Sequence, residues 1–147
     1  MAKERKSVQY IREVSWEEYD RLLSKLALKI RNNALKSTNN SIGKYSRFLY
    51  GIPRGGLIVA TCLTHLDECL SLFVSDVSRV ADPNFPLVIV DDIVDSGKTA
   101  EEYKNIIQIK VEVAALFYRE GASFEPDFYA EKLDSDVWIK FPWERSV

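Results

Sequence analysis

The segment LVIVDDIVDSGKT, residues 87–99, constrains the fold of this chain more than any other part of the sequence. Its first eight residues are apolar except for two adjacent acids. Such a run predicts a strand that is buried on both faces of a parallel sheet. A short polar turn follows, and from Lys98 through Ile107 the sequence is compatible with a helix. A strand, a tight turn and a helix in this order predict an α/β fold.

The turn after this strand has the properties of an anion site. Unpaired backbone N–H groups and the positive end of the helix dipole point to the same place at the start of a helix, and a phosphate fits there. The residues predicted to hold it are Asp95, Ser96, Gly97, Lys98 and Thr99. The simpler interpretation, in which Asp95 or Ser96 is an ordinary helix cap, leaves the adjacent acids of the strand unexplained.

The adjacent acids are Asp91 and Asp92. Like charges at this range repel, so the two carboxylates require hydroxyl donors or positive charge nearby and do not bind the phosphate themselves. The diol of a sugar, or Mg²⁺ with its own bound waters, meets this requirement. The segment therefore predicts a phosphorylated sugar as the ligand.

A competing motif, the phosphate loop of many nucleotide-binding proteins, also ends in Gly-Lys-Thr. That loop requires a glycine five positions before its second glycine. Asp92 holds that position here, and its carboxylate would oppose the phosphates. We therefore reject this motif.

Apolar patterning predicts the other elements. In chain order they are an amphipathic helix that begins after Ser15 and extends to Ile30, a loop at 32–44, a strand at 48–52, a buried helix at 57–63, a strand at 70–74 and a strand at 111–119. The strand, helix and strand between 48 and 74 predict a parallel crossover. The aromatic tail is expected to form short strands or a lid.

The loop Ile52-Pro53-Arg54-Gly55-Gly56 is a second candidate site. Adjacent glycines at the end of a strand let the backbone approach a ligand closely, and an arginine suits phosphate oxygens. An ordinary glycine turn is the alternative. The loop follows a strand, and Asp91 and Asp92 also lie near the end of a strand. This shared position favours a ligand-binding loop over an ordinary turn.

The central motif resembles the phosphoribosyl pyrophosphate signature of the type I phosphoribosyltransferases. That resemblance implies an α/β fold with a central parallel sheet flanked by helices and a small hood from the N- and C-terminal segments. It also implies Mg²⁺ as cofactor and a role for Arg54 and Gly55 in binding the donor's pyrophosphate. Related enzymes carry a long mobile loop near 75–86, which is short here and has no tyrosine.

The ending WIKFPWE resembles the C-terminal segment of the xanthine-guanine phosphoribosyltransferases. By that resemblance Trp138 stacks on a purine, and Ile139 offers backbone groups to its edge. Arg119 falls where those enzymes carry a lysine that contacts the 6-oxygen, but its planar fork differs from a point charge. Lys140 stands where some relatives have an acid, so the preferred purine stays open. Plain core packing is the alternative for the tryptophan.

The expected reaction joins a purine base to the sugar of phosphoribosyl pyrophosphate and releases pyrophosphate. Asp95 is the expected general base or hydrogen-bond partner at the purine ring nitrogen. Asp91 and Asp92 are expected to face the ribose hydroxyls and the metal, directly or through water. The alternatives are a non-catalytic regulator of the same fold that binds phosphoribosyl pyrophosphate or a nucleotide, an enzyme with a pyrimidine acceptor, and a simple interaction domain.

Composition limits the cellular setting. The length of 147 residues predicts one domain, 1–147, and a net charge of -2 gives no basic excess for nucleic acid. Apolar runs fall far short of the roughly 20 residues that a membrane span requires. The N-terminus lacks the apolar core of a secretory signal, so we expect a cytoplasmic protein. The family resemblance implies a homodimer or homotetramer.

Overall fold

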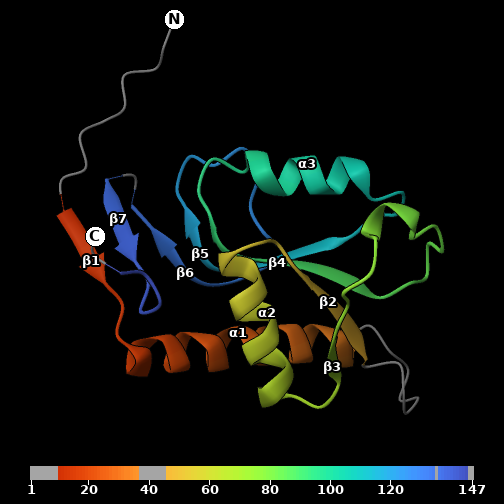
Figure 1. Cartoon of the computed structure of the whole chain (residues 1–147), viewed down its shortest axis with the longest axis horizontal. Coiled ribbons are helices and arrows are strands. Elements are labelled where there is room, and N and C mark those ends of the chain that lie inside the picture. The colour runs from red at the N-terminus through yellow and green to blue at the C-terminus, as the bar shows by residue number, and fades with distance from the viewer. Residues whose placement is uncertain (1–9, 37–45, 135, 146–147) are drawn as a thin grey trace, which may run out of the picture.

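The computed structural model describes residues 10–36, 46–134 and 136–145 (Figure 1). Its elements in chain order are β1 (Tyr10–Glu13), α1 (Trp16–Lys36), β2 (Arg47–Gly51), α2 (Gly55–Leu66), β3 (Leu70–Leu72), the 3-10 turn η1 (Val77–Arg79), β4 (Leu87–Val94), α3 (Lys98–Ile106), β5 (Glu112–Arg119), β6 (Phe128–Leu133) and β7 (Val137–Lys140). This order alternates strands with helices as the sequence predicts. None of the helices in these ranges is long and apolar enough to cross a bilayer.

A five-stranded sheet forms the centre of the molecule, in the order β3-β2-β4-β5-β6. Every neighbouring pair of strands in it is parallel. The strand with the two acids, β4, is the middle strand, so its carboxyl end lies among the loops that follow its neighbours (Figure 1). The predicted parallel sheet is thereby confirmed.

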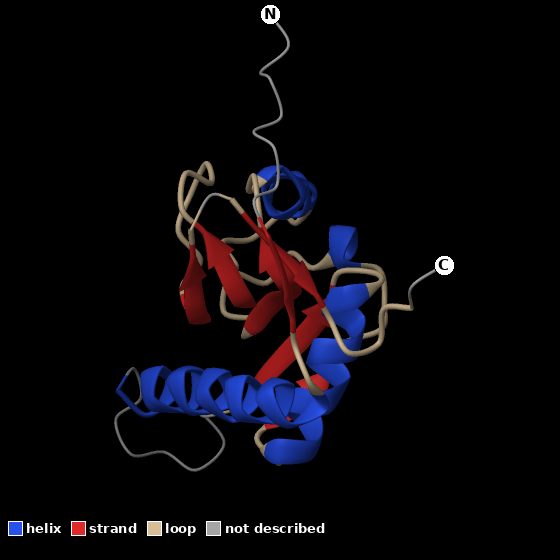
Figure 2. Ribbon diagram, turned by 90° about the vertical axis from the view of Figure 1, so that its left-hand side faces the viewer, coloured by secondary structure: helices blue, strands red, loops and turns tan. Residues whose placement is uncertain are grey.

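Helices cover both faces of this sheet (Figure 2). Alternate residues of β4 pack to opposite sides: Val88 and Val90 join the core under α1 and α2, whereas Leu87 and Ile89 join the core under α3. All four side chains are 3% exposed or less. The strand is therefore buried on both faces, as its apolar sequence indicates.

Helix α1 begins where the sequence predicts and ends later. The backbone N–H of Glu18 donates to Oγ of Ser15 at 3.0 Å, which caps the helix. The expectation of a loop from residue 32 is wrong for 32–36, which are helical. Ala34 continues the buried stripe of Ile30, and this burial outweighs the low helix propensity of the asparagines before it. Residues 37–44 lie outside the described ranges.

A second, two-stranded sheet pairs the first and last strands of the described chain, β1 and β7, in parallel (Figure 1). We term these two strands the hood. Arg12 of β1 joins it to the main body, since its guanidinium forms ion pairs with Glu18 and Glu131 and lies over the ring of Phe117. The hydrogen bond from Arg12 lowers the pKa of Glu131. The predicted hood is confirmed.

Candidate active site

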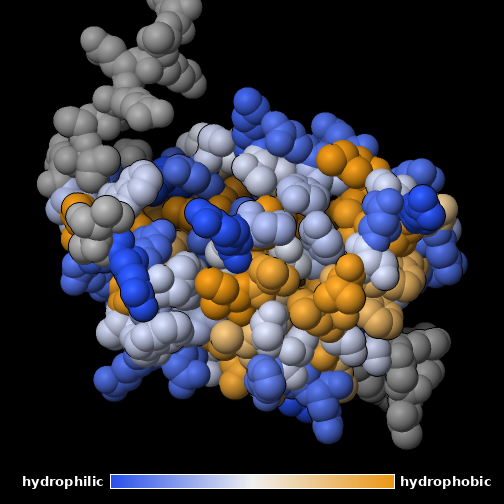
Figure 3. Space-filling view, viewed as in Figure 1, coloured by the Kyte–Doolittle hydropathy of each residue, from blue (hydrophilic) through white to orange (hydrophobic). Residues whose placement is uncertain are grey.

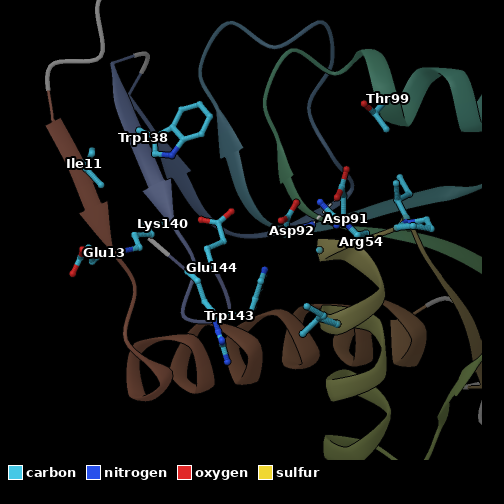
Figure 4. A pocket seen from close by; sticks show the side chains of 15 residues that line it. Ile11, Glu13, Arg54, Asp91, Asp92, Thr99, Trp138, Lys140, Trp143 and Glu144 are labelled. Atoms are coloured by element: carbon cyan, nitrogen blue, oxygen red, sulfur yellow. Dashed lines mark hydrogen bonds and ion pairs between the residues drawn. The ribbon is translucent and has the colours of Figure 1, made fainter. Parts of the chain in front are cut away.

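A cleft of about 1110 Å³ opens between the hood and the carboxyl ends of the central strands (Figure 4). It is lined by Ile11, Glu13, Ile52, Pro53, Arg54, Gly55, Ile58, Asp91, Asp92, Thr99, Trp138, Lys140, Trp143, Glu144 and Arg145. Ligands of open α/β sheets bind outside the carboxyl ends of the strands, and this cleft has that position. The predicted residues Arg54, Asp91 and Trp138 come together here although they are far apart in the sequence.

The two acids are adjacent residues of β4, and each borders a different helix. Asp92 packs against the start of α2, whereas Asp91 faces α3 and also borders a smaller pocket at the start of that helix. Oδ1 of Asp91 accepts a hydrogen bond from the backbone N–H of Asp92 at 2.9 Å. The carboxylates therefore stand side by side at the edge of the cleft, as the sequence predicts.

Asp91 is the most perturbed carboxyl group in the described part of the site. Burial, together with a hydrogen bond and charge repulsion from the neighbouring carboxyl of Asp92, raises its pKa to about 8. At neutral pH the ligand-free protein therefore holds Asp91 largely protonated. A hydroxyl donor or a cation in the cleft favours its ionised form.

Replacing Asp91 by asparagine is expected to stabilise the fold. The carboxyl is neutral in the folded chain and ionised in the unfolded chain between about pH 4 and pH 8, so wild-type stability falls as pH rises through that window. The amide has no such penalty. We expect Asp91→Asn to raise the free energy of unfolding at pH 8 by more than about 1.4 kcal/mol, the value of one pKa unit.

Urea unfolding at pH 5 and pH 8 measures this effect. The gain should be larger at pH 8 than at pH 5. A gain that is equal at both pH values would show that Asp91 ionises normally in the folded chain.

The glycine loop brings backbone close to the acids. A Cβ added to Gly55 would lie 2.0 Å from Oδ2 of Asp92, and one added to Gly56 would lie 2.3 Å from the carbonyl oxygen of Val90. Only glycine permits this approach of α2 to the end of β4. Arg54 is exposed and lines the cleft beside the acids (Figure 4). The guanidinium of Arg54 and the backbone of Gly55 therefore both line the cleft. The family resemblance predicts that these two residues bind pyrophosphate.

The turn between β4 and α3 encloses a small pocket of about 60 Å³. Its lining residues are Asp91, Ile93, Val94, Asp95, Ser96, Gly97, Thr99 and Ala100. Gly97 caps α3 with φ of 88°, a left-handed conformation, and the backbone N–H of Ser123 donates to the carbonyl of Ser96 at 2.8 Å. The Lys98 N–H lies 3.3 Å from Oγ of Ser96, at the start of the helix. The turn is therefore shaped by glycine and held by the loop that follows β5.

This small pocket opens toward the cleft, since Asp91 and Thr99 line both. The opposite end of the cleft is the hood. Ile11 and Trp138 are register partners on β1 and β7, and both are more than half exposed there, at 63% and 53%. The cleft thus runs from the small pocket at the start of α3, past two carboxylates, to the apolar pair of the hood.

Ile139 lies between the two cleft-facing residues of β7 and is itself 5% exposed, in the core. The N–H of Val14 donates to the carbonyl of Lys140 at 2.9 Å, so Lys140 directs its backbone toward β1. Successive residues of a strand direct their backbone groups to opposite edges. The N–H and C=O of Ile139 therefore point to the other edge of β7, as recognition of a base by its backbone requires.

Arg119 and Asp95 form an ion pair that the sequence did not reveal. Nε of Arg119 donates to Oδ1 of Asp95 at 2.6 Å, and Nη1 donates to the carbonyls of Val137 at 2.6 Å and Asp134 at 3.0 Å. The arginine side chain is 12% exposed and that of Asp95 is 55% exposed. Arg119 does not line the cleft, and its contact with a purine stays a prediction.

Ile11 and Glu13 are cleft residues that the sequence reasoning missed. Nζ of Lys140 lies 3.5 Å from Oε1 of Glu13, so the hood presents a charged pair next to its apolar pair. The strand that carries both residues is only four residues long and has no clear alternation of apolar and polar side chains. Their place in the cleft depends on pairing with β7, which no local pattern indicates.

Asp91 and Asp92 provide oxygen ligands of the kind that Mg²⁺ prefers. Within the described ranges no group of three or more His, Cys, Asp or Glu side chains is arranged to hold a metal by itself. Mg²⁺ is commonly bound by one or two carboxylates together with substrate phosphates. The two acids fit a metal that arrives with a phosphorylated ligand.

Comparisons with known proteins agree with this geometry. The xanthine-guanine phosphoribosyltransferase of Desulfotalea psychrophila is 26% identical over 146 residues, which cover 89% of this chain and 84% of that protein. A purine phosphoribosyltransferase structure from Pyrococcus horikoshii Ot3 matches with a TM-score of 0.67 and 26% identity, over 93% of this chain and 96% of that one.

The Helicobacter pylori xanthine-guanine-hypoxanthine phosphoribosyltransferase shares the fold, with a TM-score of 0.64 and 21% identity over 92% of this chain and 94% of that one. No model of a protein family matches the chain. The chain has the fold of the type I phosphoribosyltransferases and is similar in sequence to the xanthine-guanine phosphoribosyltransferases.

Proposed function

We propose that this enzyme transfers the 5-phosphoribosyl group from phosphoribosyl pyrophosphate to a 6-oxopurine, which is guanine, xanthine or hypoxanthine, and releases pyrophosphate. One observation carries the proposal. A phosphate-sized pocket at the start of α3 opens, through Asp91 and Thr99, to a cleft that ends at Trp138. A nucleotide has its phosphate, ribose and flat base in the same order.

The donor is expected to lie along the carboxyl ends of the central strands. The backbone of Asp95 to Thr99 holds its 5-phosphate, where the N-terminus of α3 favours negative charge. Asp91 and Asp92 face the ribose hydroxyls. Arg54 and the backbone at Gly55 bind the pyrophosphate.

Bond cleavage at the sugar leaves positive charge on the ring, and carboxylates beside it stabilise that charge more than the starting state. Asp92, held against Gly55, is placed to do this. Arg54 offsets the negative charge of the departing pyrophosphate. Mg²⁺, when bound with the donor, supplies further positive charge to the same leaving group.

The acceptor is expected to lie between the sugar and the hood. Trp138 stacks on the purine, and the outward backbone groups of Ile139 bind its edge. Asp95 accepts the proton from the purine ring nitrogen through the carboxylate oxygen that Arg119 does not hold. In the enzymes that this chain resembles, a lysine at the position of Arg119 contacts the 6-oxygen.

One assay tests this function. Purified protein is mixed with Mg²⁺, phosphoribosyl pyrophosphate and guanine, xanthine, hypoxanthine, adenine or uracil, and pyrophosphate release is measured. We expect release with one or more 6-oxopurines and none with uracil. Binding of the donor without release from any base would support the regulator instead, which the enzyme names of the relatives do not favour.

We also propose that the enzyme is a homodimer or homotetramer that works in the cytoplasm. Helix α2 has no Asp, Glu, Lys or Arg, and Figure 3 shows apolar side chains gathered over and beside it. Leu57 and Leu66 on this helix are exposed by 42% and 46%. A helix that is apolar on its outer side usually packs against another surface.

Sedimentation of a charged variant checks the assembly. Leu57→Glu is expected to convert the oligomer to monomers, because it places a carboxylate in an apolar contact. Leu28→Glu, at a leucine of α1 that is 57% exposed, is the control and should leave the mass unchanged. A monomeric wild type would contradict the proposal directly.

A further inference from the structure

The side chain of Arg119 joins the two ends of the cleft. Its Nε holds Asp95 in the turn that follows β4, and its Nη1 holds two backbone carbonyls at and before the start of β7. One of these carbonyls belongs to Val137, which directly precedes Trp138. A single guanidinium therefore connects the phosphate turn to the strand that carries the proposed base platform.

The geometry of this contact requires arginine. A guanidinium is a rigid planar fork, so it fixes acceptors on two segments relative to each other. A lysine ammonium is a point charge on a flexible stem and does not fix two separate segments in the same way. The side chain of Arg119 is also only 12% exposed, and its Nε and Nη1 both donate to protein acceptors.

The spacing between these two segments decides the proposed reaction. The attacking ring nitrogen and the sugar carbon must be held roughly 3–3.5 Å apart, and a displacement of about 1 Å can cost on the order of 10²-fold in rate. The 5-phosphate fixes the sugar, whereas Trp138 and Ile139 fix the base. A contact that fixes the distance between the phosphate turn and β7 therefore also fixes the distance between the sugar carbon and the ring nitrogen.

We propose that Arg119 is a positioning residue, a clasp between the phosphate turn and β7, and that it does not recognise the 6-oxygen of the purine. The inference rests on the proposed function, since it assigns the two segments to the two halves of one nucleotide. Arginine at this position then changes the role that the related enzymes give to a lysine.

Binding of three ligands by calorimetry separates the clasp from a direct contact. GMP and 2-aminopurine riboside 5′-monophosphate differ only in the 6-oxygen and in the N1 proton that accompanies it, and ribose 5-phosphate has no base. For Arg119→Met we expect all three to bind more weakly, with the two nucleotides weakened by the same factor. Arg119→Lys should recover only part of each loss.

Kinetics provide the second readout. At saturating substrates Arg119→Met should lower kcat on the order of 10²-fold while the thermal midpoint shows that the variant is folded. Lys132→Met is the control, since it removes a half-exposed cation of β6 that pairs with Glu120 away from the cleft. It should leave binding and kcat unchanged.

A loss that affects GMP alone, with normal binding of the other two ligands, would overturn the clasp and support contact with the 6-oxygen. Arg119→Ala provides the same comparison if Arg119→Met is unfolded. These equilibria involve no chemistry, so a wild type that binds nucleotides but releases no pyrophosphate would count against the proposed function alone.

Discussion

Asp95→Asn is expected to lower kcat by roughly 10²- to 10⁴-fold at saturating purine, the usual contribution of a general base. The asparagine side chain keeps an oxygen that accepts the hydrogen bond from Nε of Arg119, so the turn should keep its shape. What it loses is the negative charge and the ability to take a proton. We therefore expect the KM for phosphoribosyl pyrophosphate to change only a few-fold.

Steady-state pyrophosphate release, with guanine and donor both saturating, measures this effect. Asp20→Asn, on the exposed side of α1, makes the same chemical change outside the cleft and should keep wild-type kcat. Near-normal turnover of Asp95→Asn would remove the proton-accepting role from this residue. The 5-phosphate site is not affected by that outcome, since it depends on backbone N–H groups.

Gly55→Ala is expected to cost on the order of 10²-fold in kcat/KM with little change in stability. The new Cβ would lie 2.0 Å from Oδ2 of Asp92 and 2.5 Å from its Cγ, so the carboxylate must turn away. A displacement of about 1 Å beside the reacting centre can lower the rate on the order of 10²-fold. The fold itself should tolerate the change, because Gly55 is helical and alanine favours helix more than glycine does.

Gly121→Ala is the matched control for this substitution. Gly121 has φ of 90° and no atom within 4 Å of an added Cβ, so alanine there is strained without touching the site. We expect a loss of about 1–2 kcal/mol in stability and unchanged kcat/KM. Activity and the thermal midpoint of both variants are to be compared. Equal activity of Gly55→Ala and wild type would show that the position of Asp92 does not matter.

The phosphate end of the site was predictable because its signals are local. Apolar residues around Asp91 and Asp92 predict β4, and the turn chemistry of Ser96 and Gly97 predicts the start of α3. Each of these inferences uses residues close together in the sequence. Parallel pairing of β4 with its neighbours then follows from general topology rules.

The base end depends on contacts between distant segments, which no local pattern reveals. Ile11 reaches the cleft only through its register with Trp138, and Arg119 meets Asp95 only when β4, β5 and the start of β7 have come together. The extension of α1 to residue 36 has a similar cause, because the core buries Ala34. The place of Ile11, the ion pair of Arg119 and the end of α1 therefore depend on tertiary burial and strand pairing, which override local sequence preference.

The pairing of β1 with β7 has a consequence for synthesis of the protein. Residue 12 cannot meet residue 139 until nearly all of the described chain has left the ribosome, whereas the acids of β4 and the turn before α3 emerge much earlier. The nascent chain can therefore form the pocket between β4 and α3 before the strands that carry Ile11 and Trp138 have paired.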